Sequence, residues 1–121
     1  MKQETRQKLK DVLEEVTELV EKLDFLDIQL LRKFYHTNKP FPNDTQVWCF
    51  PILYQEMKTA HHLKIGPEAL RKRLDNFVRL NLLEKVKNSN PVSYLPVRGK
   101  ESFVRSVIAK FFLLQGLSKF L

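Results

Sequence analysis

Apolar residues recur at alternating three- and four-residue intervals along the first 26 residues of the chain. The stripe comprises Leu9, Val12, Val16, Leu19, Leu23 and Leu26, and Leu13 and Val20 widen it. This spacing places the apolar side chains on one face of an α-helix, at the a and d positions of a heptad repeat. No Gly or Pro interrupts residues 4–23. The pattern therefore predicts an amphipathic, coiled-coil-like helix over 4–23.

An apolar stripe on an isolated helix must be covered by something. Either the stripe packs on the rest of its own chain, or it forms a seam with a second copy. The final segment, residues 101–117 or longer, is predicted to be a helix that is apolar on most sides, and the two terminal helices are expected to pack together. We expect a homodimer, with these interface residues: Leu9, Val12, Val16, Leu19, Leu23, Phe111 and Leu114.

The middle of the chain alternates short helical and extended patterns. Residues 26–37 read as a helix whose inward positions are Leu30, Leu31, Phe34 and Tyr35. The Pro- and Asn-containing stretch 38–46 is predicted to be a loop. The run QVWCF, which begins at its last residue, favours a short strand. A further helix is expected over 52–64, ended by Gly66, with Pro67 in the first turn of the next helix.

The helix predicted over 67–81 has two different faces. Leu70, Leu74, Phe77 and Val78 gather on one face as core, and basic residues occupy the other. A β-hairpin should follow, with strands at 82–87 and 92–97 around the turn Asn-Ser-Asn-Pro. The sequence thus predicts a mainly α-helical protein with a small β-hairpin.

Charge is distributed unevenly along the 121 residues. The net charge is +7, but residues 1–27 hold five basic and eight acidic side chains, a net of −3. Residues 28–121 hold sixteen basic and six acidic side chains, a net of +10. A positive balance of that size attracts polyanions such as nucleic acids.

Other chemistry finds little support in the sequence. A single cysteine, Cys49, excludes an internal disulfide and fits a reducing compartment. The charged N-terminus does not resemble a signal peptide, and the apolar C-terminal stretch is interrupted by charges, so no membrane segment is expected. His61 and His62 are adjacent and point to different helix faces, and with His36 and Cys49 they show no metal-ligand spacing. We expect no enzymatic activity, no metal, no cofactor and no small-molecule ligand.

Residues 66–86, GPEALRKRLDNFVRLNLLEKV, followed by a hairpin, resemble the winged helix-turn-helix DNA-binding proteins, especially small archaeal and bacterial regulators. In that family a Pro-Glu pair opens the recognition helix, and a Leu-rich exit ending in Glu leads into the first wing strand. The matching residues here are Pro67-Glu68 and Leu80 to Glu84. The family usually has Gly where this chain has Asn81, and Asn also tolerates the left-handed conformation.

The resemblance implies a recognition helix that enters the major groove and a wing that contacts the backbone. It divides the chain into residues 1–24, a winged helix-turn-helix at 25–98, and residues 99–121. The DNA-contacting residues expected on the helix are Glu68, Arg71, Lys72, Asp75 and Arg79. Those expected on the wing are Lys85 and Lys87, on its first strand, with Asn88 and Asn90 at its tip.

The function expected is sequence-dependent binding of double-stranded DNA by a dimer, as a transcriptional regulator or a chromatin-like architectural protein in the cytoplasm, associated with the nucleoid. The main alternative is a winged helix that serves as a protein-interaction module in a larger assembly. A single-strand or RNA binder is a third reading. The aromatic residues Trp48, Phe50 and Tyr54 are better explained as core than as a stacking platform for bases.

Overall fold

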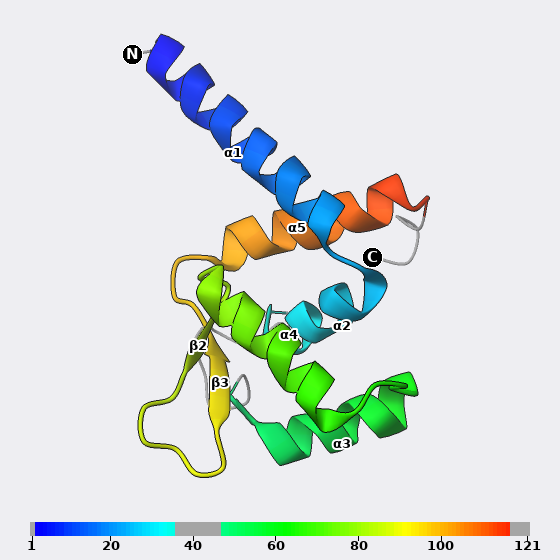
Figure 1. Cartoon of the computed structure of the whole chain (residues 1–121). Helices are drawn as coiled ribbons and strands as arrows, with labels where there is room; N and C mark the ends of the chain where they lie inside the picture. The colour runs from blue at the N-terminus through cyan, green and yellow to red at the C-terminus, as the bar shows by residue number, and fades with distance from the viewer. Residues whose placement is uncertain (1, 36–46, 117–121) are drawn as a thin grey trace. The chain divides into compact units, whose positions relative to one another are not determined.

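The computed structural model describes residues 2–35 and 47–116 of the chain (Figure 1). These residues form five α-helices and a three-stranded antiparallel sheet, which confirms the predicted mainly helical class. The helices are α1 (Lys2–Lys22), α2 (Phe25–Tyr35), α3 (Phe50–His61), α4 (Pro67–Arg79) and α5 (Glu101–Leu114). The strands are β1 (Trp48–Cys49), β2 (Leu83–Lys85) and β3 (Ser93–Pro96).

The chain divides into two compact units. One contains residues 1–32 and 102–121, and the other contains residues 33–101. The sequence-based division after residues 24 and 98 assigned all of α2 to the middle segment. In the structure α2 is divided between the two units, with its residues up to Arg32 in the first and those from Lys33 in the second.

In the first unit, only Leu23 and Asp24 lie between α1 and α2, and no Gly or Pro separates the two helices. The backbone N–H of Asp27 donates to Asp24 Oδ1 at 2.9 Å, and the N–H of Asp24 donates to Asp27 Oδ2 at 3.1 Å. This reciprocal pair is a capping box, which satisfies N–H groups that a helix start leaves open. The chain therefore starts a new helix at Phe25 instead of extending α1.

Aromatic rings from α2 and α5 meet in the same unit. The ring centroids of Phe25, Phe111 and Phe112 lie 6.0 to 6.4 Å from one another. The guanidinium of Arg32 lies 5.4 Å from the centroid of Phe112, a cation–π distance. Aromatic pairs at these separations add stabilisation beyond the area they bury.

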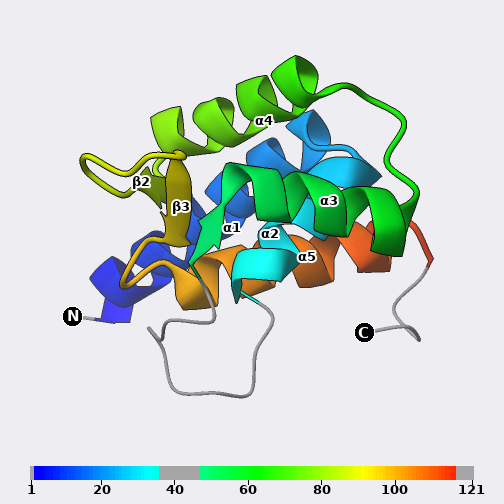
Figure 2. The ribbon, with the colours of Figure 1, turned by 90° about the horizontal axis from the view of Figure 1, so that it is seen from below.

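The second unit contains the sheet, in the order β1-β3-β2, with both pairings antiparallel. Trp48 of β1 lies opposite Tyr94, and so does Lys85 of β2. Figure 2 shows the strands beside the start of α3 and the end of α4. The sheet thus joins the predicted hairpin to a third short strand, which is the one that the run QVWCF indicated.

A buried tyrosine ties three distant parts of the second unit together. The hydroxyl of Tyr35 donates to the carbonyl of Leu82 at 2.8 Å and accepts from the N–H of Val97 at 2.9 Å. Burial raises the pKa of Tyr35 to about 12, because the ionised form would lose its hydration. This hydroxyl fixes the end of α2 against the exit from α4 and the end of β3.

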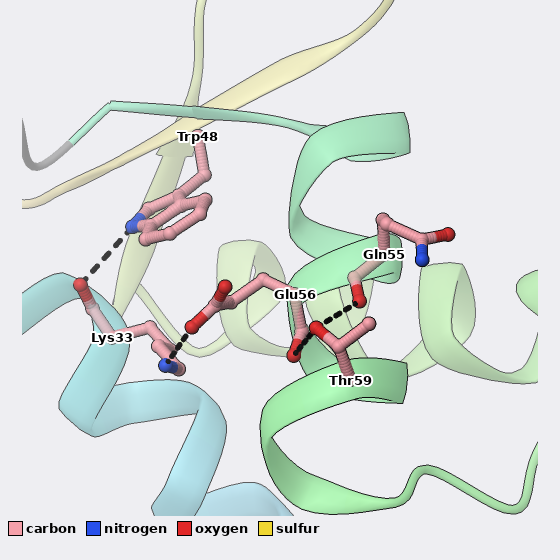
Figure 3. A network of polar contacts seen from close by, with 5 residues as sticks. All are labelled: Lys33, Trp48, Gln55, Glu56 and Thr59. Carbon is pink, nitrogen blue, oxygen red and sulfur yellow. Dashed lines mark hydrogen bonds and ion pairs between the residues drawn. The ribbon is translucent and has the colours of Figure 1, made fainter.

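A polar network fixes the start of α3 relative to the end of α2 (Figure 3). The indole N–H of Trp48 donates to the carbonyl of Lys33 at 3.1 Å, and the ammonium of Lys33 contacts Glu56 Oε1 at 2.8 Å. The hydroxyl of Thr59 donates to the carbonyls of Gln55 at 3.0 Å and Glu56 at 3.3 Å. The hydrogen bond and ion pair that Glu56 forms with Lys33 lower the pKa of the Glu56 carboxyl.

Helix α3 differs from the prediction at both ends. It begins at Phe50 with Pro51 in its first turn, and it ends at His61 instead of residue 64. His62 adopts the left-handed conformation (φ 53°) that we expected Gly66 to supply. The N–H of Leu63 then closes the helix by donating to the carbonyl of Met57 at 3.2 Å. Gly66 instead is the extended N-cap of α4, so its predicted role was wrong.

The prediction for α4 holds in its main features. Pro67 is in the first turn, and Asn81 has the expected left-handed backbone (φ 61°). Leu70, Leu74 and Phe77 are buried, whereas Val78 is only half-buried. The helix ends at Arg79, two residues earlier than expected.

Parts of three predictions lie outside the described residues: the end of the helix expected over 26–37, most of the loop 38–46, and any continuation of α5 beyond residue 116. In the helix expected over 26–37, the four predicted inward positions are confirmed, because all are buried: Leu30, Leu31, Phe34 and Tyr35. Within residues 2–35 and 47–116, no helix combines the length and apolar character needed to cross a membrane.

Candidate nucleic-acid interface

The outward face of α4 carries the residues that the sequence pointed to. Glu68, Arg71, Lys72 and Arg79 are exposed and Asp75 is half-buried, and their spacing of three and four residues places them on one side of the helix. The opposite side is anchored by the buried Leu70, Leu74 and Phe77. Because these three side chains are buried, the charged face is held toward solvent.

Arg71 is oriented by an aromatic ring. Its guanidinium lies 4.6 Å from the ring centroid of Phe50, whose ring stacks on that of Tyr54 at 6.1 Å. At the other end of this row, the ammonium of Lys58 lies 5.4 Å from the Tyr54 centroid. These four residues form a cation–aromatic row, in which stacking holds Arg71 in place while it remains exposed.

Sequence reasoning missed the cation–aromatic row, although it assigned its aromatic residues to the core. Phe50 is buried, as expected, but Tyr54 is half-buried, as is the neighbouring Trp48. The spacing of Phe50, Tyr54 and Lys58, four residues apart on one helix face, was the available signal. The contribution of Arg71 depends on how α3 and α4 pack, which no local pattern reveals.

Asp75 connects α4 to the hairpin. Its Oδ1 accepts a hydrogen bond from the hydroxyl of Tyr94 at 2.9 Å and pairs with the ammonium of Lys85 at 3.0 Å. Burial raises the pKa of Tyr94, and the hydrogen bond to Asp75 raises it further. Two residues predicted to contact DNA, Asp75 and Lys85, therefore contact each other, and they bring α4 and β2 into one surface.

The remaining charges of the α4 face have simpler surroundings. The guanidinium of Arg79 donates a hydrogen bond to the side-chain carbonyl of Asn76, one turn earlier. Lys72 is exposed and forms no ion pair with any described residue. Among the basic residues expected to contact DNA from α4, Lys72 is therefore the one for which the described residues provide no cation–π or hydrogen-bond partner.

The hairpin tip is closed by a serine. The hydroxyl of Ser89 donates to the carbonyl of Val86 at 3.0 Å and accepts from the N–H of Ser93 at 3.1 Å. Asn88 adopts a left-handed backbone (φ 57°), which Asn tolerates better than most residues. Lys87 lies beyond the end of β2 at Lys85, so its predicted place on the first strand was wrong. Strand pairing gives way to this turn before Lys87.

The exposed polar groups of α4 and the hairpin form a basic surface. Lys87, Asn88 and Asn90 are all exposed at the tip. Residues 67–91 contain six basic and three acidic side chains, a net of +3. This surface can offer cations and amide groups to a polyanion, the chemistry used in contacts to phosphates and base edges.

The residues predicted to form a dimer interface do not share one accessible surface. Val16, Leu23 and Phe111 are buried within the single chain, and Leu19 is half-buried. Leu9, Val12 and Leu114 are exposed. The stripe of α1 is thus covered in its second half and open in its first half.

Two of the three histidines lie at the C-terminal end of α3, where His61 is half-buried and His62 is exposed. In the described parts of the chain, no three His, Cys, Asp or Glu side chains are grouped as metal ligands would be. His36 lies outside those parts.

Comparisons with protein-family models, with curated proteins and with solved structures found no match to this chain.

Proposed function

We propose that residues 25–98 form a winged helix-turn-helix that binds double-stranded DNA, with α4 as the recognition helix and β2–β3 as the wing. The order of elements from α2 to β3 supports this assignment, because it is the order that the family resemblance implies for residues 25–98. The observation that carries the proposal is the joining of two basic elements. The outward face of α4 and the hairpin meet through Asp75 and Lys85 in one surface.

In this proposal the outward face of α4 lies in the major groove, which is about 12 Å wide and admits one helix. Arg71 and Lys72 are placed to reach base edges or phosphates, and a fixed Arg can hold guanine through two hydrogen bonds. The cation–aromatic row restricts the guanidinium of Arg71 before DNA binds, so less side-chain freedom is lost on binding.

The exposed tip residues Lys87, Asn88 and Asn90 then contact the phosphate backbone or the adjacent minor groove. These contacts fix the orientation of α4 on the duplex without reading sequence. The protein would act as a transcriptional regulator or an architectural DNA-binding protein, and neither role requires a cofactor.

The test is a titration of fluorescent duplex DNA at several salt concentrations. If about five phosphates are neutralised, log K against log salt should have a slope near −4 to −5. The variant Lys72→Ala/Lys87→Ala should bind more weakly and with a slope shallower by about 2, because two phosphate-range cations are removed. Lys10→Ala/Lys22→Ala on α1 is the matched control and should leave binding unchanged.

Binding that is absent at low salt, or insensitive to salt, would contradict the proposal. Competition with single-stranded DNA or RNA of equal length separates the remaining readings. A single-strand binder would lose the labelled duplex to those competitors. If no nucleic acid binds, the protein-interaction reading of the same surface gains support.

A further inference from the structure

The first half of α1 presents an apolar stripe that the described residues of its own chain leave open. All ten residues from Arg6 to Glu15 are exposed. Leu9 is 60% exposed, Val12 45% and Leu13 65%, whereas Val16, the next member of the stripe, is 4% exposed. Three large apolar side chains in neighbouring turns of one helix form a contiguous patch, which in proteins commonly marks an interaction surface.

The charges around this patch are arranged in two opposite halves. Arg6, Lys8 and Lys10 give residues 6–10 a net charge of +3, and Asp11, Glu14 and Glu15 give residues 11–15 a net charge of −3. The segment as a whole is neutral but strongly polarised along the helix axis. Such a segment is complementary to a copy of itself that runs in the opposite direction.

We propose that residues 6–15 of α1 bind the same residues of a second copy of this chain as an antiparallel helix pair. Pairing the segment about its own midpoint places Leu9 opposite Val12 of the second copy, and Val12 opposite its Leu9. Position a then faces position d, as in antiparallel coiled-coil packing. The basic half of each helix lies along the acidic half of the other.

One ion pair across the seam is specific to this arrangement. Lys8 and Glu15 are seven residues apart, so they lie on the same flank of the stripe, two turns from each other. In an antiparallel pair each flank faces the same flank of the partner helix. Lys8 therefore meets Glu15 of the second copy, and twofold symmetry gives this contact twice.

A parallel pair would lack this complementarity. It would place residues 6–10 of both copies side by side, with three positive charges against three, and residues 11–15 with three negative charges against three. Like charges on adjacent helices destabilise the pairing. The polarised sequence thus selects the direction, while the apolar stripe supplies the attraction.

The burial of Val16, Val20 and Leu23 limits the length of the seam. About one and a half heptads remain available, which is short for a coiled coil, so the dimer is expected to be weak and reversible. The dimer does not depend on the proposed DNA binding and is tested without DNA, so either proposal can fail alone.

The first test measures self-association of the full chain by sedimentation equilibrium over a wide concentration range. Leu9→Lys should lower the association constant by at least about tenfold, because it places a charge in the seam. Ile52→Lys is the matched control: Ile52 is equally exposed, on α3, and its substitution should change nothing. Circular dichroism confirms that both variants fold. A wild-type chain that stays monomeric, or a dimer that Leu9→Lys leaves intact, would overturn the proposal.

The second test uses the ion pair. Lys8→Glu and Glu15→Lys should each lower the association constant by about fivefold, because each replaces two attractive contacts with two repulsive ones. The double variant Lys8→Glu/Glu15→Lys should regain wild-type association, and a mixture of the two single variants should form heterodimers. Additive loss in the double variant would contradict the paired contact.

The third test determines direction. In a Cys49→Ser background, which removes the single cysteine, chains with Leu9→Cys and chains with Val12→Cys are mixed and oxidised. Antiparallel pairing predicts that mixed 9–12 disulfides form faster than 9–9 or 12–12 disulfides, because only the former meet across the seam. Preferential 9–9 and 12–12 disulfides would show parallel pairing and overturn the inference.

Discussion

Helices α4 and α1 have the same kind of sequence pattern but different surroundings. In α4 the apolar side chains Leu70, Leu74 and Phe77 are all buried, and the opposite face carries a basic surplus. In α1 the stripe is buried at Val16 and Leu23 and half-buried at Leu19, but it is open over residues 6–15, where the charges sum to zero.

The difference is the reason that we propose different partners for the two amphipathic helices. A helix whose apolar face is satisfied by its own chain interacts with partners through its polar face, and a basic polar face suits a polyanion. A helix whose apolar face is open needs a partner for that face, and a polarised charge pattern suits its own antiparallel copy. We expect the two helices to respond oppositely to the same kinds of substitution.

The largest difference is expected in stability. Leu74→Ala should lower the free energy of unfolding by about 2–5 kcal/mol, because it leaves a cavity in a closed core. Leu9→Ala should change the stability of the monomer by less than about 0.5 kcal/mol, because Leu9 is mostly exposed. Urea denaturation at low protein concentration measures both. Equal losses of stability would show that the stripe of α1 is covered within the monomer, and would contradict the difference between α1 and α4.

The next largest loss of stability is expected when Tyr35, which binds the segment after α4, is changed. Tyr35→Phe removes the hydroxyl that serves Leu82 and Val97, leaving a buried carbonyl and a buried N–H unsatisfied. A loss of about 1–3 kcal/mol is expected in the same measurement. Phe103→Leu, a substitution of a half-buried ring that removes no hydroxyl, provides a comparison without this polar term.

Tyr35 also makes stability depend on alkaline pH. The pKa of Tyr35 is raised from 10.0 to about 12 in the folded state. The folded state therefore holds its proton more tightly, and this contribution is complete below pH 10 and is lost as pH rises from 10 to about 12. Tyr35→Phe should flatten that part of the stability–pH curve. An unchanged curve would assign the alkaline loss to other groups, of which Tyr94 is the first candidate because its pKa is also raised.

Reversing one charge on each helix separates their partners. Lys72→Glu should weaken duplex DNA binding by about tenfold at low salt, because it removes one phosphate contact and adds repulsion. Lys8→Glu should leave DNA binding by the monomer unchanged and weaken self-association. Fluorescence anisotropy and sedimentation measure the two outcomes on the same samples. If Lys8→Glu by itself abolished DNA binding, residues 6–15 of α1 would also take part in DNA binding, contrary to this expectation.

The smallest effect should come from Asp75. Its carboxylate neutralises Lys85 at 3.0 Å, and both side chains are nearly half exposed, at 43% and 47%. Asp75→Asn keeps an acceptor for the Tyr94 hydroxyl but releases the charge of Lys85, so duplex affinity should rise by about two- to fivefold and the salt slope should steepen by about 0.9. Glu84→Gln, at an exposed carboxylate on β2, controls for the general gain of positive charge.

Much of the fold followed from local patterns. The apolar periodicity of residues 67–79 and the left-handed tolerance of Asn81 placed α4 and its end within two residues. The β-rich run before Phe50 indicated β1. The start of α2 was less visible, because the Asp24–Asp27 capping box separates two helices without Gly or Pro. The end of α3 was assigned to Gly66 because glycine is the usual left-handed residue, but His62 takes that conformation.

The candidate site was only partly accessible from sequence. Charge and helix spacing identified the outward face of α4, with Arg71 and Lys72 on it. They did not reveal that Arg71 stacks on Phe50 or that Asp75 pairs with Lys85. These contacts join different elements, so their existence depends on tertiary packing and not on spacing along one helix.

The sequence by itself determined that α1 and α4 are amphipathic helices, that the chain after residue 27 is strongly basic, and that residues 6–15 carry opposite charges in their two halves. Periodicity and charge order are local properties of the chain. Tertiary structure alone decided which part of each apolar stripe is covered and which polar groups are already paired. Tyr35 meets Leu82 and Val97 only after distant segments fold together. The same is true of Asp75, which meets Lys85 and Tyr94. Burial and ion pairing are properties of the folded chain, and both proposals depend on them: DNA binding by the outward face of α4 and self-association through residues 6–15.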